Sequence, residues 1–436
     1  MIPAARLAAA AEILDMIGAA STPAEQHIGT YFRRRRYAGS KDRRWVTEFV
    51  YRCLRRQGEL DWTALQVDLE PAPRSRCLLS LILFDDVAPE TLLESWFGGP
   101  HGLAELREDE NAKLAQAATL DLSAMPSEAA GNFPTWLAEK ITEQYGERAR
   151  EVMAAYGGRA PVTLRVNRLK TTRPDILDAL KQEGIAAEPT TFSPDGIILI
   201  DRLNLSRHAL LDGGMVELQD ESAQVSARLA DAKPGMTVVD FCAGGGGKSL
   251  AMAATMEHAG KIYAFDIEER RMRDIAGRAR RAGVSLIEPL VISGDDQDND
   301  IFAQLLGGMD RVFVDAPCSG SGTWRRQPDQ KWKLTEERLE ELCALQQDIL
   351  TRAAPLVAPG GHLIYATCSI FDVENKRQMD VFLSSHPDFK IVPISNIWES
   401  VDLDGKYEGD FFALTPTDIG SDGFFTAVLK KRNMSE

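Results

Sequence analysis

A chain of 436 residues is too long for a single ordinary hydrophobic core, so two or three domains are expected. The formal net charge of −15 excludes a protein that coats nucleic acid indiscriminately, and six cysteines without a Cys-x-x-Cys pair signal neither a zinc site nor a disulfide framework. The apolar start is interrupted by Arg6, Glu12 and Asp15, so no segment is expected to span a membrane. We predict a cytoplasmic, metal-free protein with reduced cysteines.

From residue 1 to about 130, apolar residues recur at helical spacing, as in WVTEFVYRCL and CLLSLILF, with Pro and Gly clusters between them. This pattern predicts an all-helical first domain. The domain is locally basic, because Arg33, Arg34, Arg35 and Arg36 are consecutive and more cations follow up to residue 56. Such a surface is either a solvated helical face or a contact for the phosphates of RNA, and this stretch alone leaves both open.

A small α/β module follows, over about residues 136–230. A short helix is predicted for WLAEKITEQYG, and PVTLRVNRLK and GIILIDRLN alternate like strands around a helix DILDALKQEG. The module closes with the turn and helix of LLDGGMVELQDESAQVSARLAD.

The last domain, residues 231–436, alternates helices with apolar runs suited to buried parallel strands: TVVDF, KIYAFD, PLVI, RVFVDA, GHLIYAT, FKIVPI and FFTAVLK. This order predicts a doubly wound sheet, in which ligands bind at the carboxyl ends of the strands. The residues suited to chemistry fall there, namely Asp240 to Lys248, Asp266, Asp295, Asp315, Cys318 and Cys368.

The first strand leads into DFCAGGGGKS, which fails two nucleotide-binding patterns. A phosphate-binding loop would need glycine where Cys242 stands, and GxGxxG read from Gly244 would need glycine at Ser249. A glycine loop and an acid at the next strand end, Asp266, suit both NAD and S-adenosylmethionine. Lys248 either pairs with an anionic group, such as a methionine carboxylate, or points to solvent.

Two cysteines are predicted to meet at the catalytic edge of this sheet. Cys318 lies in DAPCSGSGTWRRQPDQKW after the fourth strand, and Cys368 lies in YATCS after the fifth. They converge in a doubly wound sheet although they are 50 positions apart, and the alternative is that each is an ordinary apolar residue.

The motifs DFCAGGGGKS, AFDIEERR, DAPCSGSGTWRRQPDQKW and YATCSIFDVEN together resemble those of the Sun/Fmu family of RNA cytosine-5 methyltransferases, which use S-adenosylmethionine. LRVNRLK and ELQDESAQ resemble the linking module of that family, and the first domain resembles the NusB-like RNA-binding domain of its RsmB type. The resemblance implies a Rossmann-like class I methyltransferase domain (231–436), a small α/β linking module (136–230) and an all-helical NusB-like domain (1–135). In one departure, Gly244 and Gly245 replace the second Ala and the Pro of the family's Cys-Ala-Ala-Pro-Gly-Gly-Lys-Thr loop, and Ser249 replaces its Thr.

The resemblance also implies residue roles. Cys368 would be the nucleophile that adds to carbon 6 of cytosine, Cys318 would assist its release, and Asp315 would bind the cytosine ring nitrogen. From spacing alone either cysteine suits the nucleophile, because DNA cytosine methyltransferases use a Pro-Cys motif resembling Pro317-Cys318. The cofactor would contact the loop, the ribose-binding acid, an acid near adenine and an acid at the methionine end: Cys242, Ala243, Gly244, Gly245, Gly246, Gly247, Lys248, Asp266, Asp295 and Asp315, with Asp296 as a rival to Asp295.

RNA phosphates are expected on the cations after Cys318 and, more remotely, on the arginine run: Arg325, Arg326, Lys331, Lys333, Arg33, Arg34, Arg35 and Arg36. Small-subunit (16S) ribosomal RNA is the substrate that the resemblance implies, with transfer RNA as the alternative. A nicotinamide-dependent oxidoreductase would have no use for both cysteines, and a non-catalytic ribosome assembly factor would not need them together with the acids. A monomer is the default expectation.

Overall fold

The computed structural model describes residues 1–98, 101–201, 205 and 208–433. The chain forms two compact units: Met1–Arg159 with Trp324–Leu334, here the helical unit, and Ala160–Thr323 with Thr335–Glu436, here the α/β unit. The expected three-domain division stays a prediction.

The helical unit contains no strand among its described residues, which confirms the helical prediction for the first 130 residues. Buried apolar side chains from α1 to α7 form one core cluster of this unit. The helices are α1 Pro3–Gly18, α2 Ala24–Arg34, α3 Ser40–Arg55, α4 Gln57–Gln66, α5 Pro73–Asp85, α6 Pro89–Ser95, α7 Glu108–Ala118, α8 Ser127–Gly131, α9 Thr135–Tyr145, α10 Ala149–Ala155 and α17 Gln330–Lys333.

The segment Trp324–Leu334 leaves the α/β unit and packs in the helical unit. Trp324 is almost completely buried, with its ring centroid 5.9 Å from that of Phe133 and 6.1 Å from that of Tyr156. The sequence pattern placed this segment in the final domain. The prediction was wrong for this segment, which the contacts assign to the helical unit. Burying the large Trp324 ring among aromatic residues favours that assignment.

The α/β unit begins with a four-stranded antiparallel sheet in the order β2-β3-β1-β4, which confirms the predicted strands around a helix. The helix predicted for WLAEKITEQYG, α9, belongs to the helical unit instead. Thr172 caps α11 by accepting a hydrogen bond from the backbone N–H of Asp175. The elements are β1 Val162–Val166, α11 Arg173–Gln182, β2 Ala187–Pro189, β3 Gly196–Leu199, α12 Ala209–Asp212, β4 Val216–Leu218 and α13 Glu221–Leu229.

The main sheet has the order β10-β12-β9-β8-β5-β6-β7, with β11 paired to β12. Strands β5 to β9 are parallel, as predicted. The prediction was wrong for FFTAVLK, because β12 runs antiparallel between β9 and β10. Strand β10 lies at the edge of the sheet, and β12 then occupies the position between β10 and β9 and runs in the opposite direction.

The elements of this sheet and its helices are β5 Thr237–Phe241, α14 Gly247–Thr255, β6 Lys261–Asp266, α15 Glu269–Ala282, β7 Ile287–Val291, α16 Asn299–Ala303, β8 Met309–Asp315, α18 Glu336–Ala353, β9 Val357–Thr367, α19 Lys376–Ser385, β10 Phe389–Ile391, α20 Ile394–Ile397, β11 Phe412–Leu414, α21 Pro416–Ile419 and β12 Phe424–Lys431.

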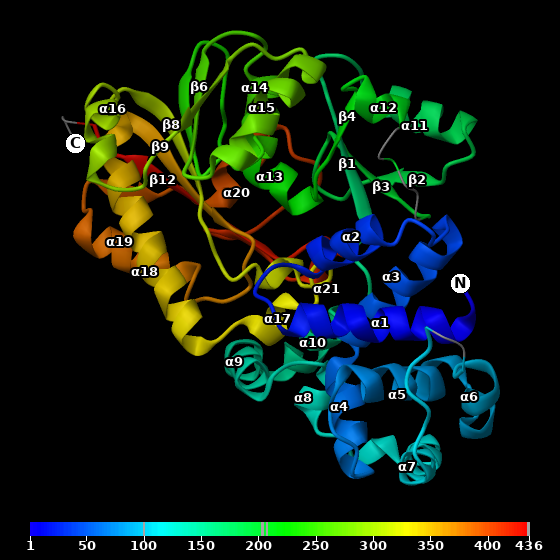
Figure 1. Ribbon diagram of the computed structural model, residues 1–436. Coiled ribbons are helices and arrows are strands. Elements are labelled where there is room, and N and C mark those ends of the chain that lie inside the picture. Colours follow the sequence, from blue (N-terminus) through cyan, green and yellow to red (C-terminus); the bar gives the residue numbers. More distant parts are fainter. Residues whose placement is uncertain (99–100, 202–204, 206–207, 434–436) are drawn as a thin grey trace. The chain divides into compact units, whose positions relative to one another are not determined.

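Helices cover both faces of the main sheet (Figure 1). Successive strand residues alternate between faces, so Val238 joins a core with α13, α14 and α15, whereas Val239 joins a core with α16, α18 and α19. This layering leaves the carboxyl ends of the parallel strands as the edge where polar side chains collect.

Candidate active site

The site lies where the order of the parallel strands reverses. From β5 the chain moves outward to β6 and β7 and then returns to the other side of β5 to form β8. The loops after β5 and β8 therefore leave the sheet in opposite directions and open a crevice, which is where ligands bind in doubly wound sheets. The predicted residues after these two strands, and Cys368 after β9, share this edge.

The glycine loop needs glycine at two of its four positions. Gly244 and Gly246 have φ of +56° and +76°, in the left-handed region that glycine favours. A Cβ at Gly246 would lie 3.0 Å from Cγ1 of Ile275, and one at Gly244 would lie 2.6 Å from a terminal nitrogen of Arg271. The loop then enters α14 at Gly247, whose first backbone N–H groups have no acceptor within the helix.

Two arginines that the sequence pattern did not single out hold this loop. Arg278 donates a hydrogen bond of 2.5 Å to the carbonyl oxygen of Gly245 and pairs with Glu217 at 2.8 Å. Arg165 donates to the carbonyl of Gly247 at 2.7 Å and also to Gln219. Burial lowers the pKa of Arg165 to about 10, which still leaves it charged at neutral pH. Two guanidinium groups thus fix the loop, and that of Arg278 acts at Gly245, where the resembling family has proline.

Two acids accept hydrogen bonds from the loop and from the residues near it. Asp266 is buried and accepts hydrogen bonds from the backbone N–H of Gly244 at 2.7 Å and of Glu268 at 2.8 Å. Asp240 is fully buried and accepts from the hydroxyl of Ser249, and burial raises the pKa of Asp240 to about 7. The signal for Asp240 was its place in DFCAGGGGKS, next to residues with a predicted role.

Cys242 begins the loop in an unusual backbone conformation. Its φ is +71°, which side-chain-bearing residues rarely adopt. Burial raises the pKa of the Cys242 thiol, and the nearby carboxylates of Asp315, Asp266 and Asp240 act in the same direction. Cys242 therefore stays a neutral thiol that lines the loop.

Lys248 does not point to solvent, which removes one of its two predicted orientations. Its ammonium pairs with Asp315 at 2.6 Å and lies 5.4 Å from the ring centroid of Phe424. Burial alone would lower the pKa of Lys248, but the charge of Asp315 and the hydrogen bond to it outweigh burial and raise that pKa. The first turn of α14 therefore carries a fixed positive charge, neutralised by an acid at the end of β8.

The two predicted cysteines meet. The Sγ atoms of Cys318 and Cys368 are 3.4 Å apart, although the residues follow different strands. The hydrogen bond with Cys368, together with burial, raises the pKa of Cys318 well above its ordinary value. Cys318 therefore keeps its proton and can donate it toward the sulfur of Cys368.

Glu374, part of the YATCSIFDVEN motif but without a predicted role, joins the two cysteine loops. It is fully buried and accepts hydrogen bonds from the backbone N–H of Ser319 at 2.7 Å, from the Ser319 hydroxyl at 2.5 Å and from the Ser369 hydroxyl. Ser319 follows Cys318 and Ser369 follows Cys368, so one carboxylate fixes the neighbours of both thiols.

The acids after β7 lie in a short loop. Asp295 is exposed, and hydrogen bonds from Ser293 and from the backbone N–H of Gln297 lower its pKa. The buried acid of this loop is Asp298, which accepts from the backbone N–H groups of Ser293 and Gly294 and pairs with Arg352 at 3.0 Å. The side chain of the rival Asp296 lies outside the described part of the structure.

The cations predicted for RNA divide into exposed and buried groups, all in the helical unit. Arg33, Arg34 and Arg36 are exposed, whereas Arg35 pairs with Glu12 at 2.6 Å over the ring of Tyr31. Arg326 and Lys333 are partly buried, and the Lys333 ammonium pairs with Asp329 at 2.8 Å.

Lys331 and Arg325 are buried, with 1% and 6% of their surface exposed. The Lys331 ammonium lies 4.7 Å from the ring centroid of Phe133, and burial, with a smaller effect of Arg55, lowers the pKa of Lys331 to about 7. These side chains are not presented to a phosphate backbone, and we correct the prediction of RNA contacts for both residues.

Two kinds of feature are absent from the described residues. No helix there is long and apolar enough to cross a membrane. Within the same residues, no group of three or more His, Cys, Asp and Glu side chains is arranged to hold a metal ion.

Comparison with family models matches two parts of the chain. Residues 227–430 match the family described as 16S rRNA methyltransferase RsmB/F. Residues 133–206 match the ferredoxin-like domain described as Methyltr_RsmF/B-like. The first match contains the described residues at the edge of the main sheet except Arg165, Glu217 and Gln219, and it does not reach the arginine run Arg33 to Arg36.

Two relatives are similar over most of their length. The probable ribosomal RNA small subunit methyltransferase B of Synechocystis sp. is 31% identical over 412 residues, covering 89% of this chain and 91% of the relative. The ribosomal RNA small subunit methyltransferase B of Pectobacterium carotovorum is 32% identical over 414 residues, covering 91% and 92%.

Two crystal structures have a fold similar to that of this chain. PH0851 has a TM-score of 0.78 at 26% identity, covering 99% of each chain. A methyltransferase homologue from Pyrococcus horikoshii has a TM-score of 0.59 at 25% identity, covering 72% of this chain and 100% of that one.

Proposed function

Because the chain belongs to the RsmB-like Sun/Fmu family of S-adenosylmethionine-dependent methyltransferases, we propose that it methylates carbon 5 of a cytosine in small-subunit (16S) ribosomal RNA through a cysteine adduct. The observation that carries the chemistry is the separation of 3.4 Å between the sulfurs of Cys318 and Cys368 at the edge of the sheet. The choice of ribosomal RNA rests on the relatives, which are named as ribosomal RNA small subunit methyltransferases.

The residues of the crevice fit S-adenosylmethionine. The loop from Cys242 to Lys248 offers backbone without side chains at Gly244 and Gly246, where a Cβ would crowd Arg271 and Ile275. In our proposal this loop holds the cofactor, Asp266 accepts from its ribose, Asp295 lies near the adenine and Asp315 faces the methionine end. The cofactor supplies an electrophilic methyl group on a sulfonium.

Carbon 5 of cytosine is a weak nucleophile, so the ring must first be activated. The thiolate of Cys368 forms a bond to carbon 6, and the electrons of the carbon 5–carbon 6 double bond move into the ring, which makes carbon 5 nucleophilic. After carbon 5 has gained the methyl group, its proton leaves to a base. The sulfur–carbon bond then breaks, which restores the double bond and the thiolate.

Cys318 is suited to assist at Cys368 because it keeps its proton. The hydrogen bond between the two sulfurs raises the pKa of Cys318, so its neutral thiol can donate a hydrogen bond to the sulfur of Cys368 when that sulfur leaves carbon 6. This direction supports the assignment of Cys368 as nucleophile and Cys318 as the residue that assists release.

Asp315 would accept a hydrogen bond from the cytosine ring nitrogen in its protonated form, in which the ring can take up the electrons released when the thiolate adds. Its pairing with Lys248 at 2.6 Å fixes the carboxylate at the end of β8. Lys248 is then a positioning residue for this acid.

The remaining parts of the proposal concern the rest of the chain. Residues 1–135 would be a NusB-like RNA-binding domain, 136–230 a linking module and 231–436 the catalytic domain. The protein would act as a monomer in the cytoplasm.

The test is to incubate the Cys318→Ala variant with S-adenosylmethionine and unmodified ribosomal RNA and to look for a protein–RNA adduct on a denaturing gel. We expect an adduct, because release is impaired, and none in Cys318→Ala/Cys368→Ala. Cys343→Ala is the matched control, since this partly buried cysteine bonds the carbonyl oxygen of Val373 and neither of the two reacting thiols, and the variant should methylate RNA like the wild type.

Other outcomes have separate meanings. Methyl transfer by Cys318→Ala without a trapped adduct would contradict the assignment of the two thiols. No methyl transfer to ribosomal RNA by the wild type would contradict the substrate, and transfer RNA would be the next substrate to test.

A further inference from the structure

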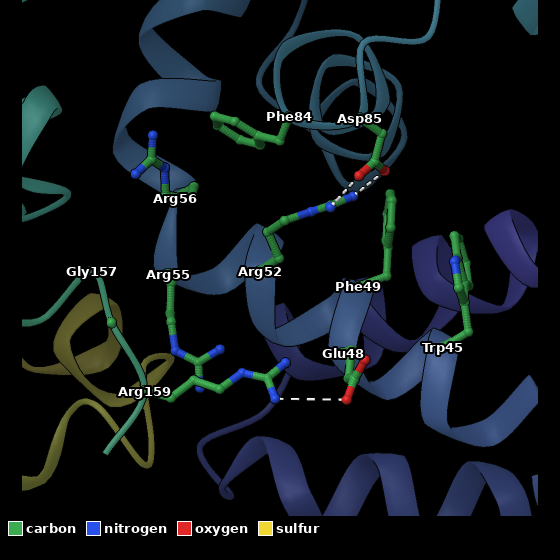
Figure 2. A pocket seen from close by; sticks show the side chains of 11 residues that line it. Trp45, Glu48, Phe49, Arg52, Arg55, Arg56, Phe84, Asp85, Gly157 and Arg159 are labelled. Atoms are coloured by element: carbon green, nitrogen blue, oxygen red, sulfur yellow. Dashed lines mark hydrogen bonds and ion pairs between the residues drawn. The ribbon is translucent and has the colours of Figure 1, made fainter. Parts of the chain in front are cut away.

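The helical unit contains a basic pocket of about 550 Å³, here the arginine pocket, which the proposed reaction does not use (Figure 2). Its walls include four arginines, Arg52, Arg55 and Arg56 from the end of α3 and Arg159 from the chain after α10. The volume falls in the range of roughly 300 to 1,000 Å³ typical of small-ligand sites, which is enough for one nucleotide.

The pocket is positive on an acidic protein. The lining carries four guanidinium groups and two carboxylates, Glu48 and Asp85, and a third carboxylate, Glu59, pairs with Arg56 at 2.6 Å from outside the lining. The whole chain, in contrast, has a net charge of −15. Clustering cations in a hollow against the overall charge concentrates the positive potential there. The ligand class that such a pocket attracts is anionic.

Aromatic rings hold two of the guanidinium groups in place. The guanidinium of Arg52 lies 4.8 Å from the ring centroid of Phe49, and that of Arg56 lies 4.6 Å from that of Phe84. A guanidinium laid over a ring keeps its planar fork of N–H donors fixed. Because these two forks already pair with Asp85 and Glu59, they shape the wall of the pocket and leave the phosphate to another arginine. The apolar ring surface beside the forks suits a ribose and base.

The four arginines differ in how far their guanidinium groups are free to bind a ligand. Arg52 makes two hydrogen bonds to Asp85, of 2.6 and 2.5 Å, and Arg55 is buried and donates to the carbonyl of Arg325. Arg159 is 44% exposed, and its ion pair with Glu48 is long, at 3.6 Å. In Figure 2, Arg52 points toward Asp85, while Arg159 extends toward Glu48.

We infer that the arginine pocket binds a phosphate and its nucleotide in a single-stranded segment of the RNA substrate, with Arg159 as the principal donor. This inference rests on the proposed function for the identity of the strand. Glu48 competes for Arg159 in the absence of RNA and limits the affinity.

The experiment measures binding of full-length protein to a short single-stranded RNA of mixed sequence, labelled with fluorescein, by fluorescence anisotropy at several salt concentrations. Arg159→Ala should weaken binding by about 3- to 10-fold and reduce the salt slope by about 0.7, because one phosphate is no longer neutralised. Glu48→Gln should tighten binding by about 2- to 3-fold, because it removes the competing carboxylate. The control is Arg107→Ala, a 75% exposed arginine of the same unit outside the pocket, which should bind like the wild type.

Several results would overturn the inference. One is an affinity of Arg159→Ala equal to that of Arg107→Ala, with no gain in Glu48→Gln. Competition by AMP at concentrations comparable to the RNA would assign a free-nucleotide site instead, and equal competition by poly-L-glutamate would assign an acidic protein partner. A parallel methyl-transfer assay separates the two proposals, since pocket-dependent binding without methylation would contradict only the proposed function.

Discussion

Each unit contains a buried lysine, Lys248 in one and Lys331 in the other, and the pKa values of the two lysines shift in opposite directions. In the α/β unit, Lys248 pairs with Asp315 at 2.6 Å, and the charge of that acid outweighs burial and raises the pKa of the lysine. In the helical unit, Lys331 lies 4.7 Å from the ring centroid of Phe133, and burial lowers its pKa to about 7. Burial alone therefore does not decide the charge of a lysine; the neighbouring group does.

The two lysines also differ in their surroundings, since one lies beside groups proposed to react and the other is buried against an aromatic ring. Lys248 stays charged at a strand end beside the glycine loop, where a fixed charge can position a reacting acid. Lys331 stands in a motif that resembles a catalytic one, yet it lies inside the helical unit, where a neutral amine is favoured. Each prediction below changes one member of this comparison or its surroundings.

The largest effect is expected for Asp315→Asn, which leaves the Lys248 cation buried without its carboxylate and removes the acid proposed to bind cytosine. Methyl transfer to RNA should fall by about 100-fold or more. The measurement is the initial rate with labelled S-adenosylmethionine. Glu288→Gln, which breaks the exposed ion pair with Lys261, is the control and should keep full activity. A rate within a few fold of wild type in Asp315→Asn would contradict the role of this acid.

The next effect concerns Lys331→Met and its dependence on pH. The pKa of Lys331 is lowered from 10.5 to about 7 on folding, so between these values the unfolded chain binds more protons than the folded one. The free energy of unfolding of the wild type therefore rises with pH across this window. The penalty of burying the lysine is complete below pH 7 and is lost near pH 10.5.

Lys331→Met should accordingly stabilise the protein by roughly 1 to 3 kcal/mol at pH 7 and by little near pH 10. Chemical denaturation followed by circular dichroism at several pH values measures this. Lys113→Met, which removes an ordinary ion pair with Asp68 in the same unit, should leave the pH slope unchanged. If Lys331→Met kept the wild-type slope, another group would be responsible for it.

A smaller effect is expected at the loop that precedes Lys248. Arg278→Ala removes the hydrogen bond to the carbonyl of Gly245, and S-adenosylmethionine should bind about 10-fold more weakly by calorimetry. Arg280→Ala, an exposed arginine on the same helix, is the control. In the Arg278→Ala background, Gly245→Pro places the family's residue in the loop and should recover part of the affinity. No loss in Arg278→Ala would show that the glycines alone hold the loop.

Much of the site was predictable because its residues are local to strand ends. An alternation of apolar runs and helices fixes a doubly wound order, and that order brings residues after neighbouring strands to one edge. Cys318 and Cys368 were expected to meet on this ground, and their sulfurs are 3.4 Å apart. The antiparallel direction of β12 was missed, since an apolar run looks the same in either direction.

The amino-acid sequence by itself determined the helical start, the doubly wound sheet, the glycine loop and the convergence of the two cysteines, because these follow from periodicity and chain order. Only the tertiary structure decided that Trp324–Leu334 joins the helical unit, that Arg278 clamps Gly245, that Glu374 links both cysteine loops and that Arg159 joins the arginines of α3 in one pocket. Each of these depends on side chains far apart in the chain. Their contacts are set by which surfaces pack together, and no local pattern of hydrophobicity or charge records that.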